Sequence, residues 1–338
     1  TQGLEPLREL WKRELARKNP DLAGASFSMP LVVPGLTAGI ATLADLFAGP
    51  GVPVVLPDLQ WDNYPLVFET RREARLVTFP FYDESGFNVA GMAAALRDAG
   101  RMGRAILLLN FPNNPTGYSP TKAEAEAIVA AVRDAARSGT RILAITDDAY
   151  FGLFYEPDTF PQSLFARFCG LDERVLAAKV DGSTKEDLTW GFRTGFVTLG
   201  AKGLGDAHYE ALTRKLMGAV RSSVSNSSVL AQSVVLRAVR SPAYEAEKRE
   251  AYETLRERYG RVKAIQAENV TVSAGGRGIA VPGVDDSQIR GLSITLPATI
   301  GSTARTVTFG FCFSHRQKAS FRTCGNRARS EGGCSAWM

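Results

Sequence analysis

The chain has 338 residues, of which 45% are hydrophobic and 22% charged, and its mean hydropathy is −0.08, as in globular proteins. No apolar run reaches the roughly 18 to 20 residues of a membrane span, and no signal sequence opens the chain, so a cytoplasmic protein is expected. The formal charge of +5 comes largely from the last segment, and a dispersed excess of this size does not predict nucleic-acid binding.

Predicted strands and helices alternate along the chain. Apolar runs predict strands at 26–34, 52–56, 74–81, 104–110, 141–146, 173–180 and 196–200. Apolar residues at helical spacing predict helices at 4–15, 35–47, 89–96, 122–139, 204–220, 229–239 and 243–264. This alternation predicts an α/β fold with a mostly parallel central sheet and helices on both faces. In such sheets the ligand site lies beyond the carboxyl ends of the strands.

Residues suited to ligand binding follow several predicted strands. The turn 35–37 enters a helix with free backbone N–H groups and a hydroxyl, which suits a phosphate but equally suits an ordinary helix cap. Trp61 can stack on a planar cofactor or pack in the core. Asn114 projects from a proline-fixed turn, and Asp147 and Tyr150 follow the strand 141–146. The sequence therefore predicts that these side chains meet at one edge of the sheet.

Lys185 is the candidate nucleophile, in a turn where the strand 173–180 ends. A lysine in a partly dry site loses proton affinity and condenses with aldehydes, although most lysines after a strand are solvated loop residues. Ser183 and Thr184 precede it, and Arg193 follows eight positions later. Hydroxyls and a fixed guanidinium suit a phosphate monoester. This combination indicates pyridoxal phosphate, whose aldehyde and phosphate would use both features.

Other chemistries have little support in the sequence. The chain has two histidines, His208 and His315, and neither lies in a recognisable hydrolase context. The four cysteines show no CxxC pairing, which makes a zinc site or a disulfide framework improbable: Cys169, Cys312, Cys324 and Cys334. No metal is therefore predicted.

Three motifs, NNPTG at 113–117, DDAY at 147–150 and STKEDLTWGFRTG at 183–195, occur together in one family. Over roughly residues 1–265 the chain resembles the class I/II aminotransferases, the aspartate aminotransferase-like branch of the fold-type I pyridoxal phosphate enzymes. The resemblance implies a cofactor-binding large domain at 1–240 and an incomplete α+β small domain at 241–300. A disordered or aberrant tail is expected at 301–338, and a cytoplasmic homodimer is implied.

The resemblance assigns roles to matching residues. Lys185 would form a Schiff base with the cofactor and move the proton from the substrate's Cα. Asp147, rather than Asp148, would pair with the pyridinium nitrogen, because the family's aspartate lies three residues before the tyrosine. Asn114 and Tyr150 would bond the ring's phenolate oxygen.

The resemblance also assigns the phosphate and substrate contacts. Arg193 would bind the phosphate, together with Ser183 or Thr184 and the turn formed by Gly35, Leu36, Thr37 and Ala38. Trp61 would stack on the ring, and both Trp61 and Asn114 would lie near the substrate. Arg221, in VRSSVSNSS at 220–228, would bind a substrate carboxylate in the neighbouring subunit's site or would be an interface arginine.

Three departures from the family pattern are visible. Gly182 replaces a serine found in many relatives, so Ser183 or Thr184 must supply the phosphate hydroxyl. The sequence at 1–15 does not match the N-terminal arm of the family, so this arm is expected to be absent. No convincing match to the arginine that binds the α-carboxylate follows Gly275, and the candidates are Arg277, Arg290 and Arg305.

The predicted function is a pyridoxal phosphate-dependent aminotransferase of amino acid metabolism, which transfers an amino group between an amino acid and a 2-oxo acid. Alternatives are a β-lyase or decarboxylase with the same cofactor, a non-catalytic cofactor-binding domain, and an inactive fragment. The sequence does not identify the substrate pair. Neither a nucleic acid nor a membrane is a predicted partner.

Overall fold

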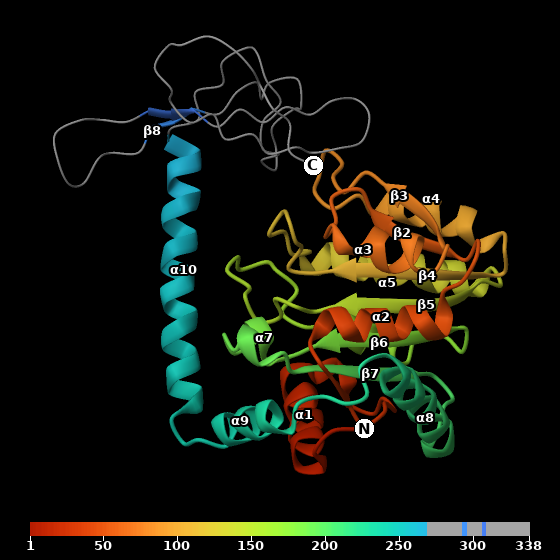
Figure 1. Ribbon diagram of the computed structural model, residues 1–338. Coiled ribbons are helices and arrows are strands. Elements are labelled where there is room, and N and C mark those ends of the chain that lie inside the picture. The colour runs from red at the N-terminus through yellow and green to blue at the C-terminus, as the bar shows by residue number, and fades with distance from the viewer. Residues whose placement is uncertain (269–292, 296–305, 309–338) are drawn as a thin grey trace, which may run out of the picture. The chain divides into compact units, whose positions relative to one another are not determined.

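A seven-stranded sheet forms the centre of the first part of the chain (Figure 1). Its strands are β1 (Leu31–Val33), β2 (Pro53–Pro57), β3 (Arg75–Phe79), β4 (Arg104–Asn110), β5 (Arg141–Asp147), β6 (Val175–Asp181) and β7 (Gly195–Ala201). They are ordered β1-β7-β6-β5-β4-β2-β3. β3, β2, β4, β5 and β6 pair in parallel in that order, while β7 is antiparallel to both of its neighbours, β1 and β6. The predicted α/β fold is confirmed.

The computed structural model describes residues 1–268, 293–295 and 306–308, with side chains up to residue 263. The chain divides into one unit over Thr1–Glu257, which contains the sheet, and a second over Arg258–Met338. In the second unit, β8 (Ser293–Thr295) and β9 (Thr306–Thr308) pair antiparallel. The rest of the predicted small domain beyond residue 268 and of the predicted tail at 301–338 lies outside the described residues. So do Arg277, Arg290 and Arg305.

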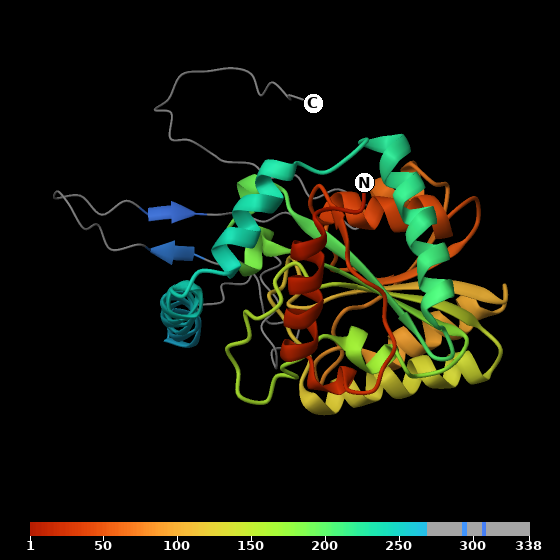
Figure 2. The same ribbon diagram turned by 90° about the horizontal axis from the view of Figure 1, so that it is seen from below.

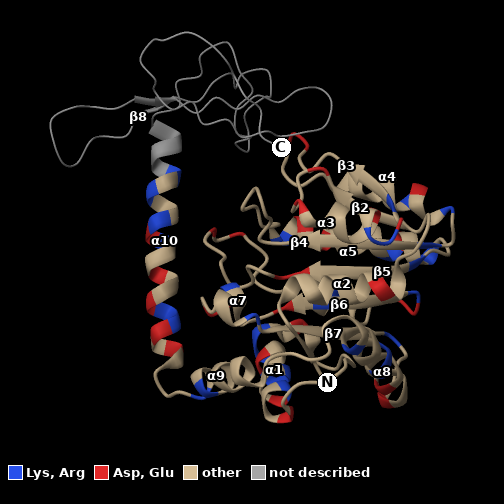
Figure 3. Ribbon diagram, viewed as in Figure 1, with Lys and Arg blue, Asp and Glu red and all other residues tan. Residues whose placement is uncertain are grey.

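Helices cover both faces of the sheet (Figure 2). The helices of the first unit are α1 (Glu5–Lys18), α2 (Leu36–Phe47), α3 (Asn63–Pro65), α4 (Val89–Gly100), α5 (Lys122–Arg137), α6 (Leu164–Phe168), α7 (Ser183–Glu186), α8 (Asp206–Ser223) and α9 (Val229–Val239). A further helix, α10 (Tyr244–Glu268), carries interleaved charges of both signs (Figure 3). None of the helices in the described part of the chain has an apolar stretch long enough to cross a membrane.

Side-chain alternation in the strands builds two cores. Leu107 and Leu109 of β4 pack toward α4, α5 and α6, whereas Ile106 and Leu108 pack toward α2 and α8. Successive residues of a strand point to opposite faces, so a strand that is apolar throughout serves both layers. This is why the run 104–110 reads as a central strand.

Several predicted elements differ from the structure by a few residues at their ends, and two differences bear on the sheet and the site. The strand expected at 26–34 shortens to Leu31–Val33, with an isolated bridge from Phe27 to Gly200, because Pro30 has no N–H for the ladder. The turn expected at Lys185 is a single turn of helix, α7. Lys185 therefore has a fixed direction, which a solvated loop would not give it.

Candidate active site

A cavity of about 150 Å³ lies at the carboxyl ends of the parallel strands. Nine of the predicted site residues line it: Leu36, Thr37, Trp61, Asn114, Asp147, Tyr150, Thr184, Lys185 and Arg193. Gly35 and Ala38 lie beside it at the start of α2. The convergence expected from the strand ends is therefore present in the structure.

Two glycines, Gly35 and Gly195, allow the segments around Arg193 to approach one another. Gly35 has a φ of 91°, and a Cβ there would lie 2.5 Å from the Nη2 atom of Arg193. A Cβ on Gly195 would lie 2.9 Å from the carbonyl carbon of Gly35. Because no side chain fits, the guanidinium rests against the N-terminal turn of α2. The free N–H groups of that turn and the positive guanidinium form an anion-binding end of the cavity.

The structure explains why position 182 is glycine, where many relatives have serine. A Cβ at this position would lie 2.5 Å from the carbonyl oxygen of Thr194, so a serine does not fit without a backbone shift. Thr184 lines the cavity instead, and its hydroxyl donates to the same carbonyl at 3.3 Å. The other predicted hydroxyl, that of Ser183, is fully buried on a different side of α7. Of the two candidate hydroxyls, only that of Thr184 belongs to a residue that lines the same cavity as Lys185.

Asp147 occupies the opposite end of the cavity, almost completely buried. Its Oδ2 accepts a hydrogen bond from the hydroxyl of Tyr64 at 2.7 Å, and its Oδ1 accepts one from the N–H of Ala149 at 3.1 Å. Burial, with a smaller contribution from the charge of Asp148, raises the pKa of Asp147 to about 6, and the Tyr64 hydrogen bond opposes this rise. The two donors therefore do not fully offset the burial of the charged carboxylate, which a facing cation would stabilise further.

Because the buried Asp147 carboxylate destabilises the folded protein, Asp147→Asn should stabilise the cofactor-free protein in a pH-dependent way. The folded state holds the Asp147 proton more tightly than the unfolded chain, so wild-type stability falls as pH rises from about 4 to 6. Asparagine removes that loss, and urea unfolding should show the variant more stable by up to about 3 kcal/mol at pH 7.5, with the difference vanishing near pH 4. Equal stability of the two proteins at pH 7.5 would contradict it.

Lys185 lies between the two ends of the cavity. Its side chain is half-buried, and its Nζ lies 4.9 Å from the centre of the Tyr150 ring. Burial lowers the pKa of Lys185, and the positive charge of Arg193 lowers it further against the opposing effect of Asp147. The amine is therefore closer to its neutral, nucleophilic form than a solvated lysine.

Besides Ala149, two polar residues that line the cavity were not predicted. Tyr64, next to Trp61 with the rings edge to face at 5.6 Å, donates to Asp147. Asn110 connects two predicted residues: its amide donates to the Asp147 carbonyl at 2.7 Å, and its Oδ1 accepts from the Asn114 N–H at 2.7 Å. A polar residue closing the apolar strand 104–110 was the available signal for Asn110. Tyr64 gave no such signal.

Asp148 belongs to a different network, on the other side of the sheet. It pairs with Lys179, which is buried and also lies 3.5 Å from Asp181. Ser163 donates to Asp148 at 2.5 Å, and the indole N–H of Trp11 donates to Asp181 at 3.1 Å. Successive residues at the end of β5 thus serve different sites, as the alternation of a strand requires. The choice of Asp147 for the cavity agrees with this geometry.

Arg221 lies apart from the cavity. It is exposed in the last turn of α8 and donates to the Ser225 hydroxyl at 2.8 Å. Among the residues that the structure describes, no group of three His, Cys, Asp or Glu side chains is arranged to hold a metal ion.

Comparisons with known proteins agree on one family. A family model described as "Aminotransferase class I and II" matches residues 12–275. Over 152 residues the chain is 30% identical to an aspartate aminotransferase of Musicola paradisiaca, an alignment that covers 44% of this chain and 34% of that protein. The resemblance seen in the sequence motifs is confirmed.

Solved structures show the same fold. An aminotransferase from Anaerococcus prevotii matches with a TM-score of 0.67 and 22% identity, over 76% of this chain and 62% of that one. An aromatic amino acid aminotransferase from Burkholderia cenocepacia matches with a TM-score of 0.61 and 25% identity, over 77% of this chain and 63% of that one. The chain thus spans less than two thirds of the length of these relatives.

Proposed function

Because the chain belongs to the class I and II aminotransferase family, we propose that it transfers an amino group between an amino acid and a 2-oxo acid, with pyridoxal 5′-phosphate as its cofactor. The observation that carries the proposal is that Arg193, Lys185 and Asp147 line one cavity. An anion-binding end, an amine of lowered pKa and a buried carboxylate are the three groups that this cofactor requires.

The residues present fit the cofactor. Arg193, the Thr37 and Thr184 hydroxyls and the first N–H groups of α2 would hold its phosphate, in the space that the absent Gly35 side chain leaves. Asp147 would hold a proton on the ring nitrogen, and that positive charge would offset the cost of burying the carboxylate. Tyr64 keeps the carboxylate in place through its hydrogen bond.

The remaining residues of the cavity have positioning and proton-transfer roles. Trp61 would lie against the ring, and Asn114 and Tyr150 would donate to the ring oxygen. When bound, the cofactor supplies an aldehyde for attachment and an electron-withdrawing ring. Lys185 would take the proton from the substrate's Cα and return it to the cofactor side, a role that its lowered pKa supports.

The test is amino-group transfer by the purified 338-residue chain with added pyridoxal phosphate. Amino donors labelled with ¹⁵N are incubated with a panel of 2-oxo acids, and mass spectrometry follows the label. Label in a new amino acid is expected. Release of ammonia or carbon dioxide instead would indicate a lyase or decarboxylase, and cofactor binding without any product would contradict the proposed transfer. Borohydride reduction and peptide mapping should place the cofactor on Lys185.

We also propose a homodimer. Large apolar side chains are exposed on the segment beside Arg193 and at the start of α9, including Trp190 at 71% and Leu230 at 74%. A second copy would cover them. Light scattering is expected to give about twice the 36.5 kDa of one chain, and Leu230→Asp should shift the mass toward the monomer. A wild-type monomer at tens of micromolar would contradict the dimer.

A further inference from the structure

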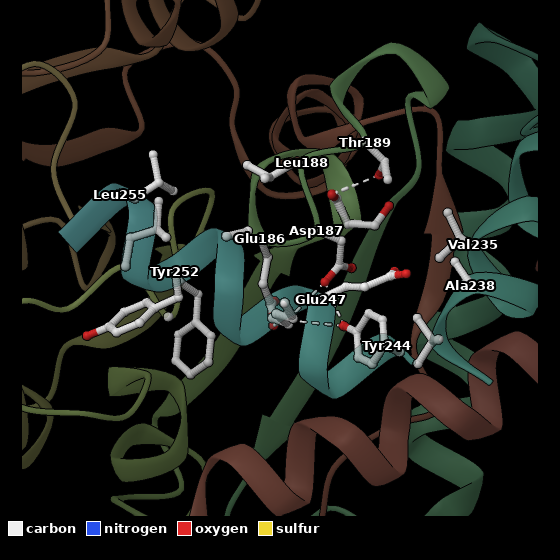
Figure 4. Close-up of a pocket in the computed structure, with 17 residues that line it drawn as sticks. Glu186, Asp187, Leu188, Thr189, Val235, Ala238, Tyr244, Glu247, Tyr252 and Leu255 are labelled. Atoms are coloured by element: carbon white, nitrogen blue, oxygen red, sulfur yellow. Dashed lines mark hydrogen bonds and ion pairs between the residues drawn. The ribbon is translucent and has the colours of Figure 1, made fainter. Parts of the chain in front are cut away.

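A second cavity lies on the other side of the helical turn that carries Lys185. It has a volume of about 260 Å³ and is lined by α7 and the segment after it, by the segment 151–153, by α9 and by the beginning of α10 (Figure 4). Ser183 and Asp187, four residues apart, share one face of this turn and line the second cavity. Thr184 and Lys185 line the first. The turn α7 is thus a wall common to both cavities.

The second cavity is apolar over most of its surface and acidic at one end. Apolar side chains come from α9 and α10, among them Val235, Tyr252 and Leu255 (Figure 4). The acidic end is Asp187, whose side chain is 7% exposed and points toward Tyr244. An apolar wall with one charged end suits a ligand with a charged group on an apolar body.

Two buried oxygen atoms in this cavity have no hydrogen-bond partner among the described residues. The Oδ1 of Asp187 accepts from the Tyr244 hydroxyl at 2.6 Å and from Lys248 at 2.9 Å, but its Oδ2 accepts nothing. The Oγ of Ser183, whose residue is 0% exposed, is also unpartnered. A buried oxygen without a partner destabilises the folded protein, and the cost is greater when the oxygen is charged. A ligand with N–H donors would remove this cost.

The charges at the acidic end favour a cation. Lys248 is shared between Asp187 and Glu186, and Glu186 also pairs with Lys18. Glu247, which also lines the cavity, adds a further negative charge. With three carboxylates against two ammonium groups, this end carries one excess negative charge, so it attracts a cation and repels an anion.

We propose that this cavity is a second ligand site, for a small organic ammonium ion with an apolar body. The ammonium donates to Asp187 Oδ2 and Ser183 Oγ, and the body packs on Val235, Tyr252 and Leu255. The proposal goes beyond amino-group transfer and does not depend on it, since no group that would hold the cofactor takes part. Ser183, expected beside the phosphate, is assigned here instead.

The test uses the full chain without cofactor and N,N-dimethylphenethylamine as the probe. This tertiary amine is positively charged at pH 7, carries one N–H, which would donate to Asp187 Oδ2, and forms no Schiff base, so it does not report on aldehyde chemistry. Calorimetric titration is expected to show binding at least about tenfold tighter than for neutral 2-phenylethanol, with no binding of 3-phenylpropionate. Equal affinity for the amine and the alcohol would overturn the proposal.

Variants locate the site. Asp187→Asn should weaken binding of the amine by about tenfold or more. The matched control Asp98→Asn, whose side chain is exposed on α4, and Lys185→Ala should bind the amine as the wild type does. Should Asp187→Asn fail to fold, Ala251→Phe decides, because it fills the cavity and keeps every polar group. If Ala251→Phe, or a folded Asp187→Asn, bound the amine with wild-type affinity, the amine would bind elsewhere and the proposed site would be refuted.

Discussion

Lys185→Ala is expected to lower amino-group transfer by at least about 10⁴-fold, because it removes both the attachment point and the group that moves the proton. Folding should be nearly unaffected. In the described part of the chain Lys185 makes no ion pair and is half-buried over the Tyr150 ring, so alanine leaves no buried charge unpaired. Initial rates under saturating cofactor measure the loss, and urea unfolding of the cofactor-free protein measures stability.

Lys202→Ala is the matched control for this experiment. Lys202 is an exposed lysine that follows β7, and it does not line the cavity. Its variant should retain wild-type rates. Retention of more than a hundredth of the wild-type rate in Lys185→Ala would show that another group performs the proton transfer.

Lys179→Met is expected to cause the largest loss of stability, about 3–5 kcal/mol at pH 8. Lys179 is 1% exposed, pairs with Asp148 and Asp181, and lies 4.6 Å from the centre of the Phe151 ring. Methionine keeps much of the volume but leaves two buried carboxylates without a cation. Urea unfolding monitored by tryptophan fluorescence provides the measurement.

The pH dependence distinguishes loss of charge from loss of packing. Burial already raises the pKa of Asp181 to about 6 in the presence of Lys179, and without this cation it rises further. At pH 5 the carboxyl is then protonated in the folded variant, so the stability lost on substitution should be smaller at pH 5 than at pH 8. If Lys179→Met lost the same unfolding free energy at both pH values, the loss would come from packing alone and not from the missing charge. Lys202→Met, on the surface, should change stability by less than about 0.5 kcal/mol.

Local sequence patterns predicted much of the fold and of the cavity. The strand 104–110 and the helix 229–239 have the predicted bounds, since an apolar run and a helical period are visible within a few neighbouring residues. Asp147 and Lys185 could be placed together because parallel strands bring their carboxyl ends to one edge. Such reasoning needs only the order of the strands and their direction.

Tertiary structure decided which side chains meet. Tyr64 bonds Asp147 across 83 positions of sequence, and Trp11 bonds Asp181 across 170. Whether Ser183 or Thr184 faces Lys185 depended on the direction of one helical turn. Local patterns give the period of an element, but the packing of its neighbours sets its rotation and register.

The sequence by itself thus determined the fold class, the family and the residues at the strand ends. Only the tertiary structure decided the buried network around Lys179, the need for glycine at position 182 and the second cavity behind Lys185. Each of these depends on distances between segments remote in the chain, which pack at atomic spacing, and a single ångström there decides whether a side chain fits.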